Sequence, residues 1–241
     1  MFRIILLSTI ILISSNLNAQ GILSTVGGKV YLGATAGISF PLSSFANDNP
    51  QDQNSGYAKT GYIIEINGGI RFLNLLEISV AAFRNSNSTD VTNLANSINT
   101  STPGITFTGE SEAWEIYGFL AGIGISFPLP EKFISDIRIL GGYQNVSSPE
   151  INMLSNSTDT YVKIEGKTIS SPVYLGSVSV RYPLSSAVYF SFGFQYIASS
   201  GNFENVQTTT SIEGNITEST ISYSRTLDAW GLNLGLKYFI L

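Results

Sequence analysis

Seven charged residues stand out because each falls on the polar side of a segment in which polar and apolar side chains alternate. They comprise four cations and three carboxylates: Glu65, Arg71, Glu77, Asp136, Arg138, Arg181 and Lys237. Because side chains two residues apart share one face of a strand, these charges should gather on the inner side of a curved sheet. Buried charges need partners of opposite sign. We therefore expect a lumen charge network of ion pairs and hydrogen bonds, with a charged constriction that selects small ions as the alternative.

The residue types that most enzymes use for acid–base and nucleophilic chemistry are missing. The 241 residues include no histidine and no cysteine, and no spacing indicates a serine or threonine activated by lysine or a carboxylate. Zinc and haem sites lose their usual ligands for the same reason. Asp52, Asn54 and Gly56 resemble the start of a calcium loop, but its terminal Glu would fall on Ile63, so we interpret them as a solvated turn. We predict that the protein is not an enzyme and has no catalytic residue, metal or cofactor.

The elements that position the charges are clearest at the end of the chain. From Thr226 to Leu241 every second residue is apolar, which predicts a strand with one lipophilic side. Its apolar face comprises Trp230, Leu232, Leu234, Leu236, Tyr238 and Ile240. Four of its residues resemble the C-terminal signal that the barrel-assembly machinery of outer membranes recognises: Asn233, Gly235, Tyr238 and Ile240. Leu241 stands where that signal more usually has a terminal Phe.

Seven earlier segments show the same alternation between turn-forming residues. They are residues 29–40, 61–72, 75–84, 114–127, 133–143, 173–182 and 187–197. The connections alternate between short turns and long loops rich in Ser, Thr and Asn. The long loops are residues 41–60, 85–113, 144–172 and 198–225. This alternation predicts antiparallel strands in up-and-down order, with both termini on the periplasmic side, where the short turns lie.

Charge decides which face of these segments meets lipid. Lys or Arg on the lipid face at mid-membrane costs about 2 to 4 kcal/mol, and all seven network charges lie on the opposite face. Aromatic residues of the apolar face fall near the segment ends, as in interfacial girdles. A soluble lipocalin-like barrel that binds a lipophilic ligand would instead place its apolar face inside, and it is a competing interpretation.

The N-terminus and the composition indicate an exported protein. Arg3 precedes an apolar run from Ile4 to Ile13, and Ala19 offers a small residue for cleavage. Residues 1–19 are therefore predicted to be a signal peptide and residues 20–241 the barrel. The formal charge of −5, with no basic run, argues against nucleic acid as a partner.

The chain from about residue 20 to its end resembles, in pattern and topology, the outer-membrane β-barrel family of OmpA-like transmembrane domains and OmpX-like small barrels. The resemblance implies an all-β, eight-stranded antiparallel up-and-down transmembrane β-barrel in the bacterial outer membrane. Its partners would be outer-membrane lipid and the barrel-assembly machinery. We expect a structural or surface-interaction role, such as adhesion or recognition of an extracellular ligand through loops 41–60, 85–113, 144–172 and 198–225. A narrow pore for ions or small solutes is the alternative.

Overall fold

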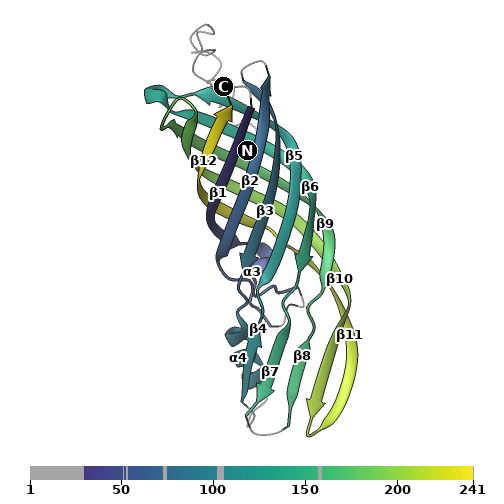
Figure 1. The fold of residues 1–241 in the computed structure, drawn as a ribbon. Coiled ribbons are helices and arrows are strands. Elements are labelled where there is room, and N and C mark those ends of the chain that lie inside the picture. Colours follow the sequence, from purple (N-terminus) through teal and green to yellow (C-terminus); the bar gives the residue numbers. More distant parts are fainter. Residues whose placement is uncertain are drawn as a thin grey trace, which may run out of the picture.

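Eight long strands form a closed antiparallel ring in the computed structural model, which describes residues 30–50, 52, 54–72, 75–101, 106–156 and 159–240 (Figure 1). The strands are β1 (Val30–Pro41), β2 (Gly61–Phe72), β3 (Leu76–Asn87), β5 (Trp114–Pro128), β6 (Ile134–Ser147), β9 (Thr168–Pro183), β10 (Val188–Ile212) and β12 (Ala229–Ile240). β12 closes the ring by pairing with β1 on one side and β10 on the other. The predicted eight-stranded up-and-down barrel is confirmed. The predicted signal peptide, residues 1–19, lies outside the described residues.

The strands pair in continuous register along the barrel. β1 and β12 are opposite each other from the pair Val30 and Ile240 to the pair Pro41 and Ala229. The short connections that the structure describes, residues 129–133 and 184–187, lie at the same end of the barrel as the start of β1 and the end of β12, and η1 (Pro130–Lys132) is part of the first (Figure 1). Because a strand repeats every two residues, this register places all the apolar residues of the predicted lipid face outside.

The long connections correct the sequence prediction. They were expected to be loops, but their described residues contain four further strands and two helices. These are α3 (Ser43–Ala46), α4 (Val91–Ser101), β4 (Phe107–Ser111), β7 (Ile151–Ser155), β8 (Tyr161–Ile164) and β11 (Asn215–Thr226). β10 continues beyond the barrel, where it pairs with β11 and with β8. The backbone groups of these segments form hydrogen bonds by strand pairing, and the Ser- and Thr-rich composition does not reveal which segments pair.

We call the part beyond the barrel the extension; its described residues are 42–50, 52, 54–60, 88–101, 106–113, 148–156, 159–167 and 200–228, and it lies at the end opposite η1 (Figure 1). Its helix α4 begins after Asp90, whose carboxylate accepts a hydrogen bond from the Asn93 amide at 3.2 Å. Near the end of α4, the Asn99 side chain accepts from the Phe107 amide at 2.6 Å and donates to the Phe107 carbonyl at 3.1 Å. These two bonds fix α4 against β4.

None of the helices within the described ranges is long and apolar enough to cross a membrane.

Candidate functional site

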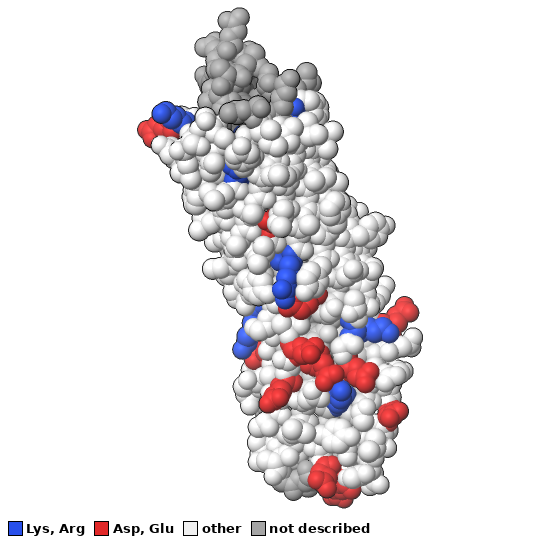
Figure 2. Space-filling model, viewed as in Figure 1, with Lys and Arg blue, Asp and Glu red and all other residues white. Residues whose placement is uncertain are grey.

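The barrel wall presents an apolar belt to its surroundings. Large outward side chains such as Ile123, Ile139 and Leu234 are more than half exposed, and charged side chains gather instead over the extension (Figure 2). Aromatic rings lie near both ends of the belt: Phe40 stacks on Trp230 with centroids 4.9 Å apart, and Phe133 meets Tyr182 at 5.2 Å. A continuous exposed apolar surface between two aromatic girdles is the surface that a lipid bilayer covers.

The first layer inside the barrel, nearest the short turns, is aromatic. Tyr31, Ile134, Tyr189 and Phe239 form one buried cluster. The Phe239 ring lies 5.4 Å from the Tyr31 ring and 4.9 Å from the Tyr189 ring, measured between centroids. The guanidinium of Arg181 lies 4.6 Å from the centre of the Phe239 ring, so the aromatic layer also contacts the charges above it.

The second layer contains the predicted charge network. Asp136 is its centre: its carboxylate lies 2.8 Å from Lys237 Nζ, 3.3 Å from Arg181 Nε and 3.9 Å from Arg71 Nη2. Glu77 lies 3.8 Å from Arg71 and accepts a hydrogen bond from the Tyr31 hydroxyl at 3.1 Å. All five charged side chains are buried, and the opposite charges offset one another.

The other two predicted residues form a separate pair. Arg138 Nη2 donates to Glu65 Oε1 at 3.0 Å, and Arg138 Nε donates to Ser177 at 3.2 Å. Asn67 also donates to Glu65 Oε1, at 2.7 Å. The structure therefore places all seven predicted charges in the lumen: Asp136 with four others in one group, and Arg138 with Glu65 in a separate pair.

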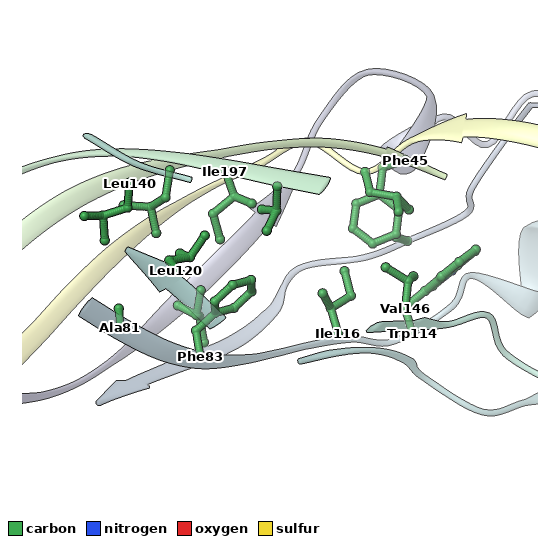
Figure 3. Close-up of a cluster of buried hydrophobic side chains, with 14 of the residues drawn as sticks. Phe45, Ala81, Phe83, Trp114, Ile116, Leu120, Leu140, Val146 and Ile197 are labelled. Atoms are coloured by element: carbon green, nitrogen blue, oxygen red, sulfur yellow. The ribbon is translucent and has the colours of Figure 1, made fainter. Parts of the chain in front are cut away.

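The third layer is apolar and continues into the extension. Leu120, Leu140 and Ile197 from different strands point toward one another inside the barrel, with Phe83 beside them (Figure 3). Farther along, Trp114 packs edge-on against Phe45, with ring centroids 5.4 Å apart (Figure 3). The sequence analysis did not identify this layer, because inward apolar residues interrupt a face that is otherwise small and polar.

The four residues of the predicted assembly signal are divided between the two sides of β12, two inside and two outside. Tyr238 and Ile240 are exposed on the lipid face. Asn233 is buried in the lumen and donates to Gln195 Oε1 at 2.7 Å. Gly235 leaves room for β1, since a side chain there would collide with the Ala34 carbonyl. These positions are compatible with the proposed signal, whose recognition stays a prediction.

The extension has a cavity of its own, about 210 Å³ in volume. Arg225 lines it, only 8% exposed, with its guanidinium 5.1 Å from the centre of the Trp114 ring and 4.6 Å from that of Tyr223. Burial lowers the pKa of Arg225 from its ordinary value, and the nearby tyrosines and Asp52 oppose that shift. Burial, followed by the charge of Asp48, raises the pKa of Tyr57, which also lines the cavity.

Sequence reasoning missed Arg225, although a signal for it exists. Ile221, Tyr223 and Arg225 share one face of β11 by their spacing of two residues, inside a stretch we expected to be a loop. Asp52 and Asn54 form the turn that was expected: Asp52 Oδ1 accepts from the Asn54 amide at 2.9 Å.

The closed ring, the apolar belt and the buried interior charges define a transmembrane β-barrel of the bacterial outer-membrane type. The lipocalin-like arrangement is not found, because the apolar face points outward and the network charges point inward.

No family model and no curated protein matches the sequence. Solved structures with similar architecture include Neisserial surface protein A, with 14% identity, a TM-score of 0.46 and coverage of 88% of this chain and 97% of that one. The attachment invasion locus protein Ail of Yersinia pestis has 10% identity and a TM-score of 0.41, over 88% of this chain and 99% of its own. The outer membrane protease OmpT of Escherichia coli has 8% identity and a TM-score of 0.32, over 88% and 94%.

Proposed function

We propose that this chain is a non-conducting outer-membrane barrel that acts in recognition at the cell surface through its extension. The observation that carries the proposal is the division of the molecule into a filled barrel and a folded extension with its own cavity. Tyr31, Arg181 and Leu120, one from each layer of the lumen, are each fully buried. Side chains packed to this degree support a filled lumen and favour a barrel that does not conduct.

We infer that the role is not catalytic. The sequence lacks histidine and cysteine, the residues that most readily act as base or nucleophile near neutral pH. Within the described ranges, no three Asp or Glu side chains cluster so that they could hold a metal ion. We therefore propose that the extension binds a ligand and does not transform it.

A narrow pore is the second candidate, and two observations favour it. Arg181 Nη1 and Nη2 are buried without a hydrogen-bond partner in the described structure. A cavity of about 20 Å³ beside Arg138 and Lys237 has room for about one water molecule. If the aromatic layer moved and more water entered beside these cations, small anions could pass through the lumen.

Planar-bilayer recording of the detergent-folded protein separates the two candidates. We expect no discrete current steps from protein whose folding is shown by a gel-mobility shift between heated and unheated samples. Reproducible steps that change in Arg138→Gln or Arg181→Gln would overturn the non-conducting assignment and make the lumen the functional site.

The recognition role is tested by shortening the hairpin of β10 and β11. Replacing residues 204–222 by an Asn-Gly turn keeps the paired Phe203 and Tyr223 and removes the strands above them. On an array of glycans, peptides and small molecules, we expect the full chain to bind and the shortened variant to lose that binding while keeping the heat-dependent mobility shift. Equal binding by both, or none by the full chain, would contradict recognition through the extension.

A further inference from the structure

The cavity of the extension has walls that are mostly apolar. Leu94 of α4, Ile151 of β7, Ile164 of β8 and Ile221 of β11 line it from different elements. Its volume of about 210 Å³ is smaller than the roughly 300 to 1,000 Å³ typical of sites for drug-sized ligands. Such a space suits a compact group, about the size of one ring with a short side chain.

Arg225 is the buried cation at this cavity, and its surroundings differ from those of the lumen cations. Arg71, Arg138, Arg181 and Lys237 each form an ion pair with a carboxylate. Among the described residues, Arg225 forms none; its Nε donates to the Asn54 carbonyl at 3.0 Å, and its plane is held by Trp114 and Tyr223. The guanidinium is therefore fixed in position and keeps its terminal N–H groups for an acceptor of opposite charge.

The floor of the cavity is preformed. The Trp114 indole donates to the Gly56 carbonyl at 3.1 Å, and a side chain at position 56 would collide with the Phe45 backbone. Tyr57 has a φ of 51°, in the left-handed region that non-glycine residues seldom adopt. Its amide donates to the Asn47 carbonyl at 3.0 Å, and its carbonyl accepts from the Asp90 amide at 2.7 Å. Surrounding bonds thus hold a strained residue at the cavity, as occurs at many binding sites.

We propose that this cavity binds a small organic acid, with its carboxylate on the Arg225 guanidinium and an apolar body against Leu94, Ile164 and Ile221. The proposal rests on the proposed function, since it names the ligand class of the extension. The planar fork of a guanidinium matches a carboxylate with two parallel hydrogen bonds. Asp52 also lines the cavity, so a monoanion is favoured over a dianion.

Three ligands test this assignment on the full detergent-folded chain: phenylacetate, its neutral isostere phenylacetamide, and glucuronate, an acid with a polar body. Calorimetric titration at two temperatures prevents a vanishing enthalpy from hiding binding. We expect phenylacetate to bind and the other two to bind at least about tenfold more weakly, because one loses the charge-assisted hydrogen bonds and the other places hydroxyl groups against aliphatic walls.

Variants locate the site. Arg225→Gln should weaken phenylacetate about tenfold or more, since losing hydrogen bonds to a charged group costs at least that factor. Because Arg225 also supports the loop at Asn54, Ile221→Phe provides a second variant that narrows the cavity and leaves the cation in place; it should weaken binding as well. Lys163→Gln, which removes an exposed cation of the extension outside the cavity, should bind as the unmodified chain does.

Several results would overturn the assignment. These are no phenylacetate binding up to about 10 mM, equal binding of phenylacetamide, or unchanged affinity in both Arg225→Gln and Ile221→Phe. Binding of glucuronate in preference to phenylacetate would also overturn the apolar-body assignment, yet would leave recognition by the extension standing. Failure of the wider proposal shows separately, as current steps in the bilayer or as ligand binding that survives shortening of the hairpin.

Discussion

Arg138 and Arg84 are each paired with a glutamate at 3.0 Å, yet the two pairs lie in different surroundings. Arg138 and Glu65 are buried in the lumen, whereas the Arg84 side chain is 44% exposed beside Glu115. An exposed pair gains little, because water and salt screen it. Removing one partner of a buried pair leaves an uncompensated charge. The two ion pairs have the same N–O distance, yet we expect the loss of their arginines to change the free energy of unfolding by different amounts.

Arg138→Ala should lower the free energy of unfolding by about 3 to 5 kcal/mol, because Glu65 would remain charged without its cation. Arg84→Ala, the matched control, should cost less than about 1 kcal/mol. Denaturant titration of the detergent-folded protein, with the heat-dependent mobility shift as the measure of folding, gives the stability of both variants. Glu65→Gln added to Arg138→Ala should recover part of the loss. Unchanged stability of Arg138→Ala would reject the structural role of the network.

At the scale of elements, β5 and β6 show how closely the lumen is packed. Gly142 faces inward, where a side chain would collide with the Phe119 carbonyl and with the backbone at Leu120. Its neighbour Gly141 faces outward, where an added methyl group would reach only the Tyr174 ring, at 3.5 Å. Two neighbouring glycines of the same strand thus differ in the room they leave for an added methyl group: Gly142 has none and Gly141 has enough.

Gly142→Ala should reduce the folded yield sharply, since β5 must shift to accept the methyl group. Gly141→Ala should fold as the unmodified chain does. The yield of the heat-modifiable species after refolding compares the two directly. Similar yields would mean that the wall around Leu120 and Phe119 can move, and that the lumen is less tightly filled than we describe.

The elements also show where sequence reasoning succeeds and where it ends. Alternation of two residues places Asn233 inside and Leu234 outside because one face of every barrel strand meets lipid. It does not give the partner of Arg138, since Glu65 is 73 residues away and pairing depends on height and direction within the lumen. The extension escaped prediction because both its faces are mixed, as in the run Thr208 to Thr210. For the same reason, the sequence did not predict Arg225 as a site residue.

At the scale of the whole molecule, exposed apolar residues lie in two different surroundings, lipid and water. Leu234 lies on the barrel wall and is 54% exposed, while Ile212 lies at the tip of the extension and is 59% exposed. Lipid covers the first and water meets the second. The same substitution at the two sites therefore tests where the membrane ends.

Leu234→Arg should destabilise the barrel by about 2 to 4 kcal/mol in lipid vesicles, as expected for arginine near the bilayer midplane. Ile212→Arg should change stability by less than about 0.5 kcal/mol, as expected of a surface position. Denaturant titration in vesicles measures both variants. Equal effects would contradict the position of the belt.

β10 extends through 25 residues, from a short turn of the barrel to the tip of the extension, and its pairing with β11 shifts register once, between Phe203 and Val206. The part from Ser200 to Ile212 is roughly 40 Å long at about 3.3 Å per residue. Barrel and extension share this strand, and Arg225 pairs with Gly201 on the barrel side of that shift, so we expect the base of the extension to keep its orientation on the barrel. A molecule held beside Arg225 would be carried at a fixed distance from the lipid and at a fixed angle to it. Its reach toward another surface would then depend on how the barrel tilts in the membrane.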